Sequence, residues 1–322
     1  MERKCRVVII VCLKDQMHNT IAFHLMKNLQ LITATGLNYT VAISPVIFEE
    51  RALRLTMSLH IAGNYDVVVV IGDFFSRLLA QKIYQELIPL PTVFIGVSDP
   101  VRLGLVESLE RPGGNVSGLI VAPSNLYVTY AEKIALFYPH ISRILIPYWP
   151  NAFSGVVGHG AIAGAQYLRS KGFIVELQET ETAPGVKAIV DRHIASFDAV
   201  WLLEGCISCS IIPSIAYKCW KQSKILFCSG SRDGIEVGGA AASYGLDLTK
   251  YATEAGTMIR RYWEGRVSLG LQPVIQLTGT RTLFFNEDLL VIAGIPRALI
   301  DALRGQDDCE VLKVWVNKPK QN

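Results

Sequence analysis

Residues 92–120, TVFIGVSDPVRLGLVESLERPGGNVSGLI, are the most informative part of this chain. The run TVFIGV is continuously apolar and β-rich, which is typical of a strand inside a parallel sheet. It ends in Ser98, Asp99 and Pro100, and Pro100 suits the first turn of a helix because its missing N–H needs no partner there. The PGGN sequence at 112–115 then predicts a turn before a second extended run, NVSGLI. We therefore expect strand, polar loop, short helix, turn and strand, with the loop facing a ligand, since ligands of open α/β sheets bind at the carboxyl ends of strands.

The same alternation of strand and helix continues on both sides of this stretch, which predicts an α/β protein with parallel sheets. The predicted strands are 6–13, 39–44, 66–72, 92–97, 115–121, 143–148, 173–177, 198–204, 224–229, 240–246 and 283–285. The predicted helices are 17–35, 48–62, 74–87, 126–137, 155–171, 186–195, 212–222, 248–264 and 288–303, the last interrupted at 294–296.

These elements form two similar series, so we expect two Rossmann-like lobes joined by three chain crossings that act as a hinge. The N-terminal lobe is predicted to hold residues 1–120 and 247–276, and the C-terminal lobe residues 121–246 and 277–304. Residues 305–322 have no evident partner in the pattern and are expected to form a tail.

Length and composition agree with this division and exclude several classes of protein. A chain of 322 residues, half of them apolar, can build two cores. The net charge of +3 is small and scattered, so no nucleic-acid partner is expected. No apolar run approaches the ~18–20 residues that a membrane span needs. Residues 6–13 read as a core strand rather than a signal peptide, so we expect a periplasmic or cell-envelope location if an export signal has been removed, and a cytoplasmic one otherwise.

Polar and aromatic residues follow the predicted strands at the edge where a ligand is expected. Such a set suits a zwitterionic ligand with an aromatic ring, because helix N-termini can hold a carboxylate, Asp99 an ammonium group, and aromatic side chains a ring. The candidate ligand-binding residues are Asp15, Gln16, Asp73, Phe74, Phe75, Ser76, Ser98, Asp99, Tyr148, Asn151, Phe153, Glu204, Ser229 and Ser231.

Structural roles remain open for several of these residues. Asp73 also suits a helix cap, and Asp99 a turn residue before Pro100. Each aromatic residue can equally pack between a helix and the sheet. The glycine-rich sequence at 155–160 is interpreted as close helix packing rather than as a dinucleotide loop.

The seven cysteines give no clear metal or redox site. Cys206 and Cys209 form a lone CxxC, and Cys219 and Cys228 are too far apart to supply the second close pair of a zinc site. We therefore expect no metal, no cofactor and no catalytic residue, and the role of the CxxC stays open.

The sequence SDPV, a following GLV and RPGGNVSG together resemble the signature of bacterial ABC-transporter substrate-binding proteins of the tryptophan/tyrosine type. The resemblance runs from about Arg6 to about Ala302 and is most specific at 92–118. It implies a two-lobed, type I periplasmic-binding-protein-like fold, an aromatic amino acid as ligand, and a pocket lined by the SDP loop, here Ser98 and Asp99, and by the helix starts.

The chain also departs from the family pattern, which puts the ligand's identity in doubt. Residues 74–77 read FFSR where family members often carry smaller residues, and residues 205–208 read GCIS where Asp-Asn is frequent. Ser229, Gly230 and Ser231 replace an expected Ser-Asp. Because an unpaired buried charge costs several kcal/mol, a changed set of anchors implies a changed ligand or weaker binding.

We interpret the chain as the substrate-binding component of an ABC transporter, which captures an amino acid or similar zwitterion reversibly in an interlobe cleft and presents it to a membrane permease. Two alternatives stay open: a sensory domain that passes closure to a signalling partner, and, less favoured, an enzyme on the same scaffold.

Overall fold

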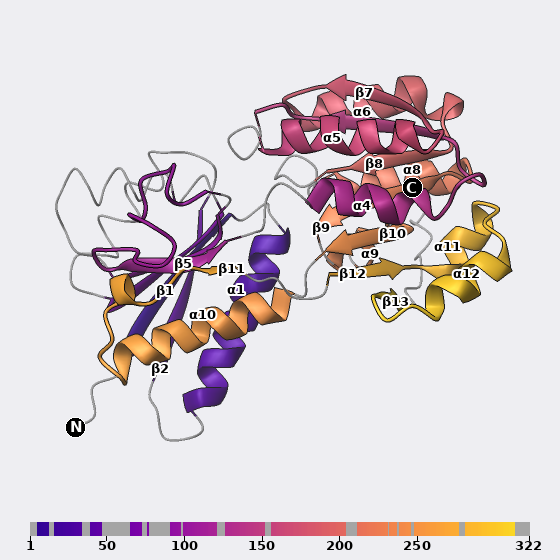
Figure 1. Cartoon of the computed structure of the whole chain (residues 1–322). Coiled ribbons are helices and arrows are strands. Elements are labelled where there is room, and N and C mark those ends of the chain that lie inside the picture. The colour runs from indigo at the N-terminus through magenta and orange to yellow at the C-terminus, as the bar shows by residue number, and fades with distance from the viewer. Residues whose placement is uncertain are drawn as a thin grey trace. The chain divides into compact units, whose positions relative to one another are not determined.

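The computed structural model describes residues 5–12, 16–33, 39–46, 65–72, 76, 91–97, 99–120, 126–151, 156–203, 211–230, 232–236, 238–245, 248–276 and 281–312 (Figure 1). The chain forms two compact units. Unit 1 comprises Met1–Ala122 and Leu248–Thr278, and unit 2 comprises Pro123–Asp247 and Gly279–Asn322. The chain therefore passes from one unit to the other three times, at 122/123, 247/248 and 278/279.

Unit 1 is built on a six-stranded parallel sheet with the order β11-β5-β4-β3-β1-β2. The strands are β1 (Cys5–Cys12), β2 (Tyr39–Val46), β3 (Val67–Ile71), β4 (Thr92–Val97), β5 (Val116–Ile120) and β11 (Ile275–Gln276). β3 and β5 are buried along their whole length, as expected for strands whose two faces are both covered. Helices α1 (Gln16–Thr33) and α10 (Leu248–Trp263) pack against each other on this unit (Figure 1). α10 belongs to the segment that returns from unit 2.

The connection between β4 and β5 departs from the predicted short helix. The amide of Leu103 donates to the carbonyl of Asp99 (3.1 Å) and that of Leu105 to the carbonyl of Pro100 (2.9 Å), so the chain forms hydrogen-bonded turns after Pro100 rather than a helix. Gly104 then adopts φ +72°, a left-handed conformation that a continuing α-helix does not allow. The prediction of a short helix between β4 and β5 is therefore wrong.

Unit 2 is built on a seven-stranded sheet with the order β13-β12-β10-β9-β8-β6-β7, in which only the β10–β12 pair is antiparallel. The strands are β6 (Arg143–Tyr148), β7 (Ile174–Glu179), β8 (Ala199–Leu202), β9 (Ile225–Gly230), β10 (Ala242–Gly245), β12 (Thr282–Phe285) and β13 (Cys309–Val311). β13 pairs with β12, so the prediction of an unpartnered tail from residue 305 is wrong for residues 309–311. The predicted α/β class with parallel sheets is confirmed.

The helices of unit 2 are α4 (Leu126–Ala135), α5 (Val156–Ser170), α6 (Ala183–His193), α8 (Ile212–Lys221), α9 (Asp233–Glu236), α11 (Glu287–Ile292) and α12 (Arg297–Arg304). Local sequence sets several of their ends. Thr182 caps α6 by accepting the amide of Gly185 (3.1 Å), and Asn286 caps α11 by accepting the amide of Leu289 (3.2 Å).

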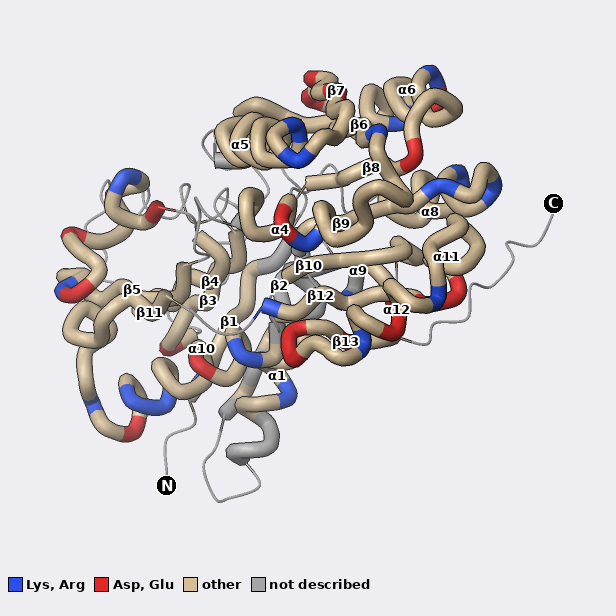
Figure 2. The backbone as a smooth tube through the Cα atoms, turned by 45° about the vertical axis from the view of Figure 1, so that its right-hand side comes forward, with Lys and Arg blue, Asp and Glu red and all other residues tan. Residues whose placement is uncertain are grey.

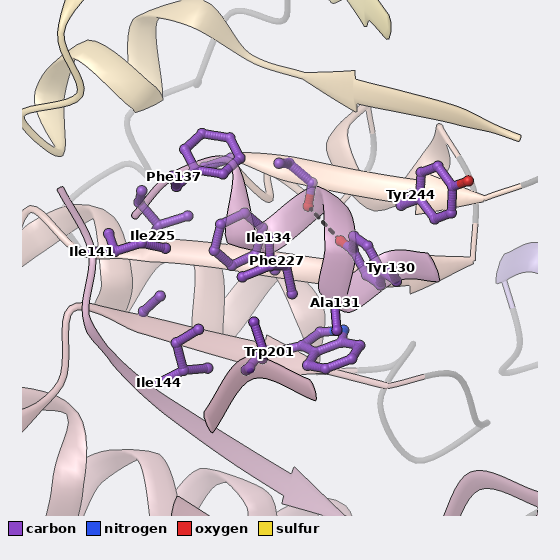
Figure 3. Close-up of a cluster of buried hydrophobic side chains, with 14 of the residues drawn as sticks. Tyr130, Ala131, Ile134, Phe137, Ile141, Ile144, Trp201, Ile225, Phe227 and Tyr244 are labelled. Atoms are coloured by element: carbon purple, nitrogen blue, oxygen red, sulfur yellow. Dashed lines mark hydrogen bonds between the residues drawn. The ribbon is translucent and has the colours of Figure 1, made fainter. Parts of the chain in front are cut away.

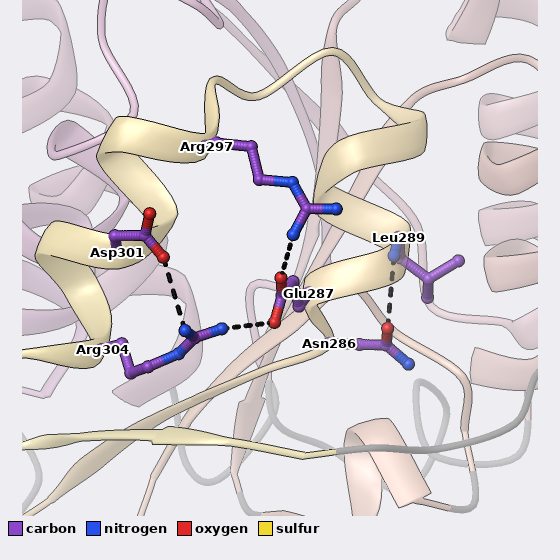
Figure 4. A network of polar contacts seen from close by, with 6 residues as sticks. All are labelled: Asn286, Glu287, Leu289, Arg297, Asp301 and Arg304. Carbon is purple, nitrogen blue, oxygen red and sulfur yellow. Dashed lines mark hydrogen bonds and ion pairs between the residues drawn. The ribbon is translucent and has the colours of Figure 1, made fainter.

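The predicted interruption of the last helix at 294–296 separates α11 from α12. Gly294 has φ +83°, and Pro296 lies next to the start of α12. The carboxylate of Glu287 accepts from Arg297 (2.5 Å) and from Arg304 (2.6 Å), which holds the two short helices together (Figure 4). Basic and acidic residues are interspersed along the backbone of both units (Figure 2).

The core of unit 2 lies on both faces of its sheet. On one face, α4 and α5 cover an aromatic cluster that includes Tyr130, Phe137, Trp201, Phe227 and Tyr244 (Figure 3). On the other face, α6 and α8 cover mainly aliphatic side chains, with two phenylalanines and two cysteines. Glycines allow the close approach of α5. A Cβ on Gly164 would lie 2.8 Å from the indole of Trp201, and one on Gly160 would overlap the ring of Tyr127 on α4. The interpretation of the glycine-rich sequence at 155–160 as helix packing is confirmed for Gly160.

Candidate functional site

The parallel register of unit 1 brings the carboxyl ends of β1, β3 and β4 to one edge of the sheet. Ile10 pairs with Val70 and Ile71 pairs with Ile95, and the amide of Gly72 donates to the carbonyl of Ile95 (2.8 Å). The segments that follow these strands leave the sheet at that edge. The predicted site residues on these segments that lie outside the described residues are Asp15, Asp73, Phe74, Phe75 and Ser98. Gln16 is the first residue of α1, and its side chain lies outside the described part.

Ser76 is buried and makes its hydrogen bonds within the turn that follows β3. Its hydroxyl donates to the carbonyl of Gly72 (2.8 Å), and its amide donates to the same oxygen (3.3 Å). Both donors are therefore engaged with the protein backbone. This arrangement favours a role for Ser76 in shaping the strand end, and direct contact of Ser76 with a ligand stays a prediction.

Asp99 is exposed just beyond the carboxyl end of β4. Its Oδ1 accepts the amide of Arg102 (2.9 Å), so one carboxylate oxygen stabilises the turn, as the alternative interpretation expected. For Oδ2 no hydrogen bond occurs within the described part of the chain. Asp99 thus combines a turn role with an oxygen that can accept from a ligand.

In unit 2, the register places Tyr148 and Ser229 in one row at the carboxyl edge of the sheet. Tyr148 pairs with Glu179, Leu202 with Cys228, and Ser229 with Tyr244. The pairing of Ile144 with Ala199 puts Tyr148 opposite position 203, and the pairing of Leu202 with Cys228 puts Ser229 opposite the same position. Tyr148 and Ser229 therefore lie in one row across the sheet, on either side of the strand β8. The structure therefore brings these two predicted residues to the same edge without a direct contact.

Tyr148 directs its hydroxyl toward the edge strand β7. The ring is buried, and the hydroxyl donates to Oε1 of Glu179 (2.8 Å). Burial, together with this carboxylate, raises the pKa of Tyr148 to about 12, so the phenol stays protonated at neutral pH. Asn151 is exposed in the turn after β6, whereas Phe153, Glu204 and Ser231 lie outside the described residues.

Ser229 is half-buried and is held by the aromatic cluster. Nε1 of Trp201 donates to its Oγ (3.1 Å). The ring of Trp201 contacts that of Tyr130 edge-on (centroids 5.2 Å apart, planes at 88°), and Tyr130 stacks on Tyr244 (5.4 Å, 25°) (Figure 3). The hydroxyl of Tyr130 donates to the carbonyl of Cys228, the residue before Ser229.

Tyr130, Trp201 and Tyr244 were not among the predicted site residues. The sequence places Trp201 and Tyr244 inside apolar strands and Tyr130 on a helix, and all three patterns are also those of ordinary core residues. The bond from Trp201 to Ser229 and the placement of the two tyrosines beside it depend on strand register and on the packing of α4, which no short motif encodes.

Cys219, Cys228 and Cys309 are not joined in disulfides. Cys219 and Cys228 are buried, and burial raises the pKa of Cys219 to about 12 and that of Cys228 further. Within the described ranges, no group of three His, Cys, Asp or Glu side chains could hold a metal ion. Cys206 and Cys209 lie outside those ranges. Of the helices that the structure describes, none is long and apolar enough to cross a membrane.

Comparison with known proteins connects this fold with a family. Residues 50–290 match the family described as ABC transporter substrate binding protein, which is well over half of the chain. A protein of Clostridioides difficile (strain R20291) named tyrosine-binding protein is 26% identical over 228 residues, which are 70% of this chain and 63% of that protein. The alignment thus covers less than two thirds of that relative's length.

Solved structures show the same fold at lower identity. The ABC domain of Streptococcus pneumoniae in complex with L-Trp superimposes with a TM-score of 0.76 at 18% identity, over 93% of this chain and 98% of that one. A ligand-free, open substrate-binding protein of Clostridium difficile with adhesive properties gives 0.66 at 20% identity, over 97% of this chain and all of the other. The expected two-lobed, type I periplasmic-binding-protein fold and the expected family resemblance are confirmed. The chain belongs to the family of ABC transporter substrate-binding proteins.

Proposed function

We propose that the protein binds an aromatic amino acid reversibly and delivers it to the permease of an ABC transporter. The observation that carries this proposal is the family match over residues 50–290, joined to a 26% identical relative whose name states that it binds tyrosine. The complex of a similarly folded protein with L-Trp supports a ligand of the same class. Delivery to a permease implies a place outside the cytoplasmic membrane.

The proposed mechanism is capture by closure, with no covalent step. The ligand contacts residues of both units, and binding shifts the protein from an open to a closed form that the permease recognises. Only contacts that bind the ligand more tightly in the closed form can produce that shift. Each unit must therefore supply some of the residues that contact the ligand. Three chain passages between the units suit a hinge, because they limit the relative motion to closing and opening.

Asp99 in unit 1 is the proposed partner of the ligand's ammonium group. An ammonium beside a carboxylate forms a charge-assisted hydrogen bond, which is about twice as strong as a neutral one. Two observations support this role. Asp99 is exposed beyond β4, and its Oδ2 can accept a hydrogen bond because the amide of Arg102 donates to Oδ1.

Isothermal titration calorimetry of the full chain with L-Tyr, L-Trp, L-Phe, L-Ala and L-Lys tests the proposal. We expect binding of at least one aromatic amino acid and no measurable binding of Ala or Lys. The informative variant is Asp99→Asn, since the amide oxygen can still accept from Arg102 while the charge is lost. Glu110→Gln, a change of an exposed carboxylate later in the same connection, is the matched control.

We expect Asp99→Asn to weaken binding about tenfold or more and Glu110→Gln to leave it unchanged. Absence of binding of all five amino acids by the unaltered protein would contradict the proposed ligand class. Equal affinity of the Asp99→Asn variant would remove Asp99 from the site. Stimulation of ATP hydrolysis by a reconstituted permease tests delivery separately.

A further inference from the structure

The hydroxyl oxygen of Ser229 accepts a hydrogen bond from a tryptophan in the core of unit 2. A serine hydroxyl can accept and can donate one hydrogen bond through its hydrogen. Because Nε1 of Trp201 can only donate, the bond of 3.1 Å between them occupies Oγ as an acceptor. Within the described part of the chain, nothing accepts the hydrogen of Ser229. That hydrogen is therefore available to an acceptor outside the core.

The position of Trp201 is itself fixed on several sides. The indole is fully buried in the cluster beneath α4 and α5. Gly164 of α5 leaves just the space that the indole occupies, and the ring of Tyr130 meets it edge-on at 5.2 Å. An indole held in this way cannot turn its N–H elsewhere without disturbing the packing of both helices. The direction of the Nε1–H bond is thus part of the fold.

The backbone at Ser229 is held by the same helix. The hydroxyl of Tyr130 donates to the carbonyl of Cys228, and the Tyr130 ring stacks on Tyr244, the register partner of Ser229 (Figure 3). Ser229 is half-buried, in contrast to residues 225–228 before it, and it lies at the carboxyl edge of the sheet. Both the atom and its surroundings are therefore positioned before a ligand arrives.

We infer that Trp201 is a positioning residue that makes Ser229 a dedicated hydrogen-bond donor to the carboxylate of the ligand. This inference rests on the proposed function, because it assigns the carboxylate of the amino acid to unit 2 while Asp99 of unit 1 holds the ammonium group. Of the groups on an amino acid, the carboxylate is the strongest acceptor, and the hydroxyl of Ser229, which already accepts one hydrogen bond from Trp201, has its hydrogen left to donate to it. A ligand held in this way contacts both units, as closure requires.

Ser229→Ala and Trp201→Phe separate positioning from folding. The first removes the donor, and the second removes the indole N–H while keeping an aromatic ring in the cluster. Phe137→Leu is the control, because Phe137 is fully buried in the same core and packs edge-on against Phe227 rather than near Ser229. Affinities are measured by calorimetry with the aromatic amino acid that the unaltered protein binds and with its decarboxylated amine, and melting temperatures without ligand monitor the fold.

We expect Ser229→Ala to weaken binding of the amino acid about tenfold and Trp201→Phe about fivefold. The double variant should bind no more weakly than Ser229→Ala alone, because the two residues act through one hydrogen bond. None of these changes should alter affinity for the decarboxylated amine, and Phe137→Leu should lower the melting temperature without changing the affinity ratio of the two ligands.

The inference is overturned if Trp201→Phe and Ser229→Ala weaken the amino acid and the amine equally, since both effects would then come from the fold. It is also overturned if their effects on the amino acid add independently. An unaltered protein that binds no amino acid contradicts the proposed function itself, and that result is distinct from either of these.

Discussion

Replacing Ser117 by alanine should destabilise unit 1 through a single buried hydrogen bond. Ser117 is fully buried on β5, and its hydroxyl donates to the carbonyl of Gln272 (2.7 Å), 155 residues later in the chain. This bond ties the most specific stretch of the sequence to the segment that follows α10 and leads into β11. The side chain of Gln272 in turn donates to the carbonyls of Met258 (3.2 Å) and Val267 (3.3 Å), so the whole segment is held from within.

The expected magnitude follows from what the alanine leaves behind. Removing the hydroxyl leaves the carbonyl of Gln272 buried without this donor, and such a loss costs about 1–3 kcal/mol of the free energy of unfolding. For a unit of roughly 150 residues, each kcal/mol lowers the melting temperature by about 2–4 °C. A cost of about 2 kcal/mol, the middle of the range of 1–3 kcal/mol, should therefore lower the melting temperature of Ser117→Ala by about 4–8 °C.

Differential scanning calorimetry measures the shift, and hydrogen exchange with mass spectrometry shows where it acts. Peptides covering β5 and residues 268–276 should exchange faster in the variant, whereas those covering β8 and β9 should not change. Ser108→Ala is the control, because the Ser108 hydroxyl bonds to the backbone of Arg111 in an exposed turn, and such changes stay within about 0.5 kcal/mol. A Ser117→Ala variant as stable as this control, or one that loosens unit 2 instead, would refute the reasoning.

Three further predictions test other parts of unit 2. Asn286→Ala should cost about 1 kcal/mol by removing the cap of α11, and Asn286→Asp should recover most of that loss in a urea titration. Because the pKa of Tyr148 rises to about 12 on folding, from an unfolded value near 10, its phenol stabilises the fold fully below pH ~10, and this stability is lost as the pH rises to about 12. Tyr148→Phe should therefore lose less stability than the unaltered protein between pH 10 and 12, measured as urea midpoints. A thiol reagent at pH 8 should label half-buried Cys309 well before buried Cys219 in the native protein, and equal labelling rates read by peptide mapping would contradict this order.

Most of the strands and helices could be predicted from the sequence because their signals are local. Most strands of both sheets are short apolar runs, and all described strands except β11 and β13, which were not predicted, lie within a few residues of their predicted ranges. The break in the last helix was also predictable, since Gly294 and Pro296 impose it by their own backbone preferences.

The elements that were not predicted depend on distant partners. β13 has three residues, one of them a glutamate, and it exists because β12 offers an open edge next to it. The helix expected after Pro100 is replaced by turns, and Gly104 takes a left-handed conformation that the apolar pattern around it does not reveal.

The candidate site follows the same division. Rules about strand ends identified Tyr148 and Ser229, because the carboxyl end of a parallel strand is a local feature. The partner of each was not predictable, since the bonds from Tyr148 to Glu179 and from Trp201 to Ser229 arise from the pairing of separate strands. A sequence therefore shows which residues lie at the carboxyl edge of the sheet. It does not show as readily which of their atoms remain available for hydrogen bonds there.

The predicted residues differ in whether their hydrogen-bonding atoms are already used within the protein, and this decides what a substitution at each position can reveal. Ser76 and Tyr148 use their hydroxyl hydrogens on the protein itself, on a backbone carbonyl and on Glu179. A substitution at either position changes the fold first, and any loss of binding would be hard to assign. Asp99 keeps one oxygen, and Ser229 its hydrogen, outside the hydrogen bonds of the described chain. Under the proposed function, Asp99 and Ser229 are therefore the positions where a change in affinity would report on the ligand more directly than a change at Ser76 or Tyr148.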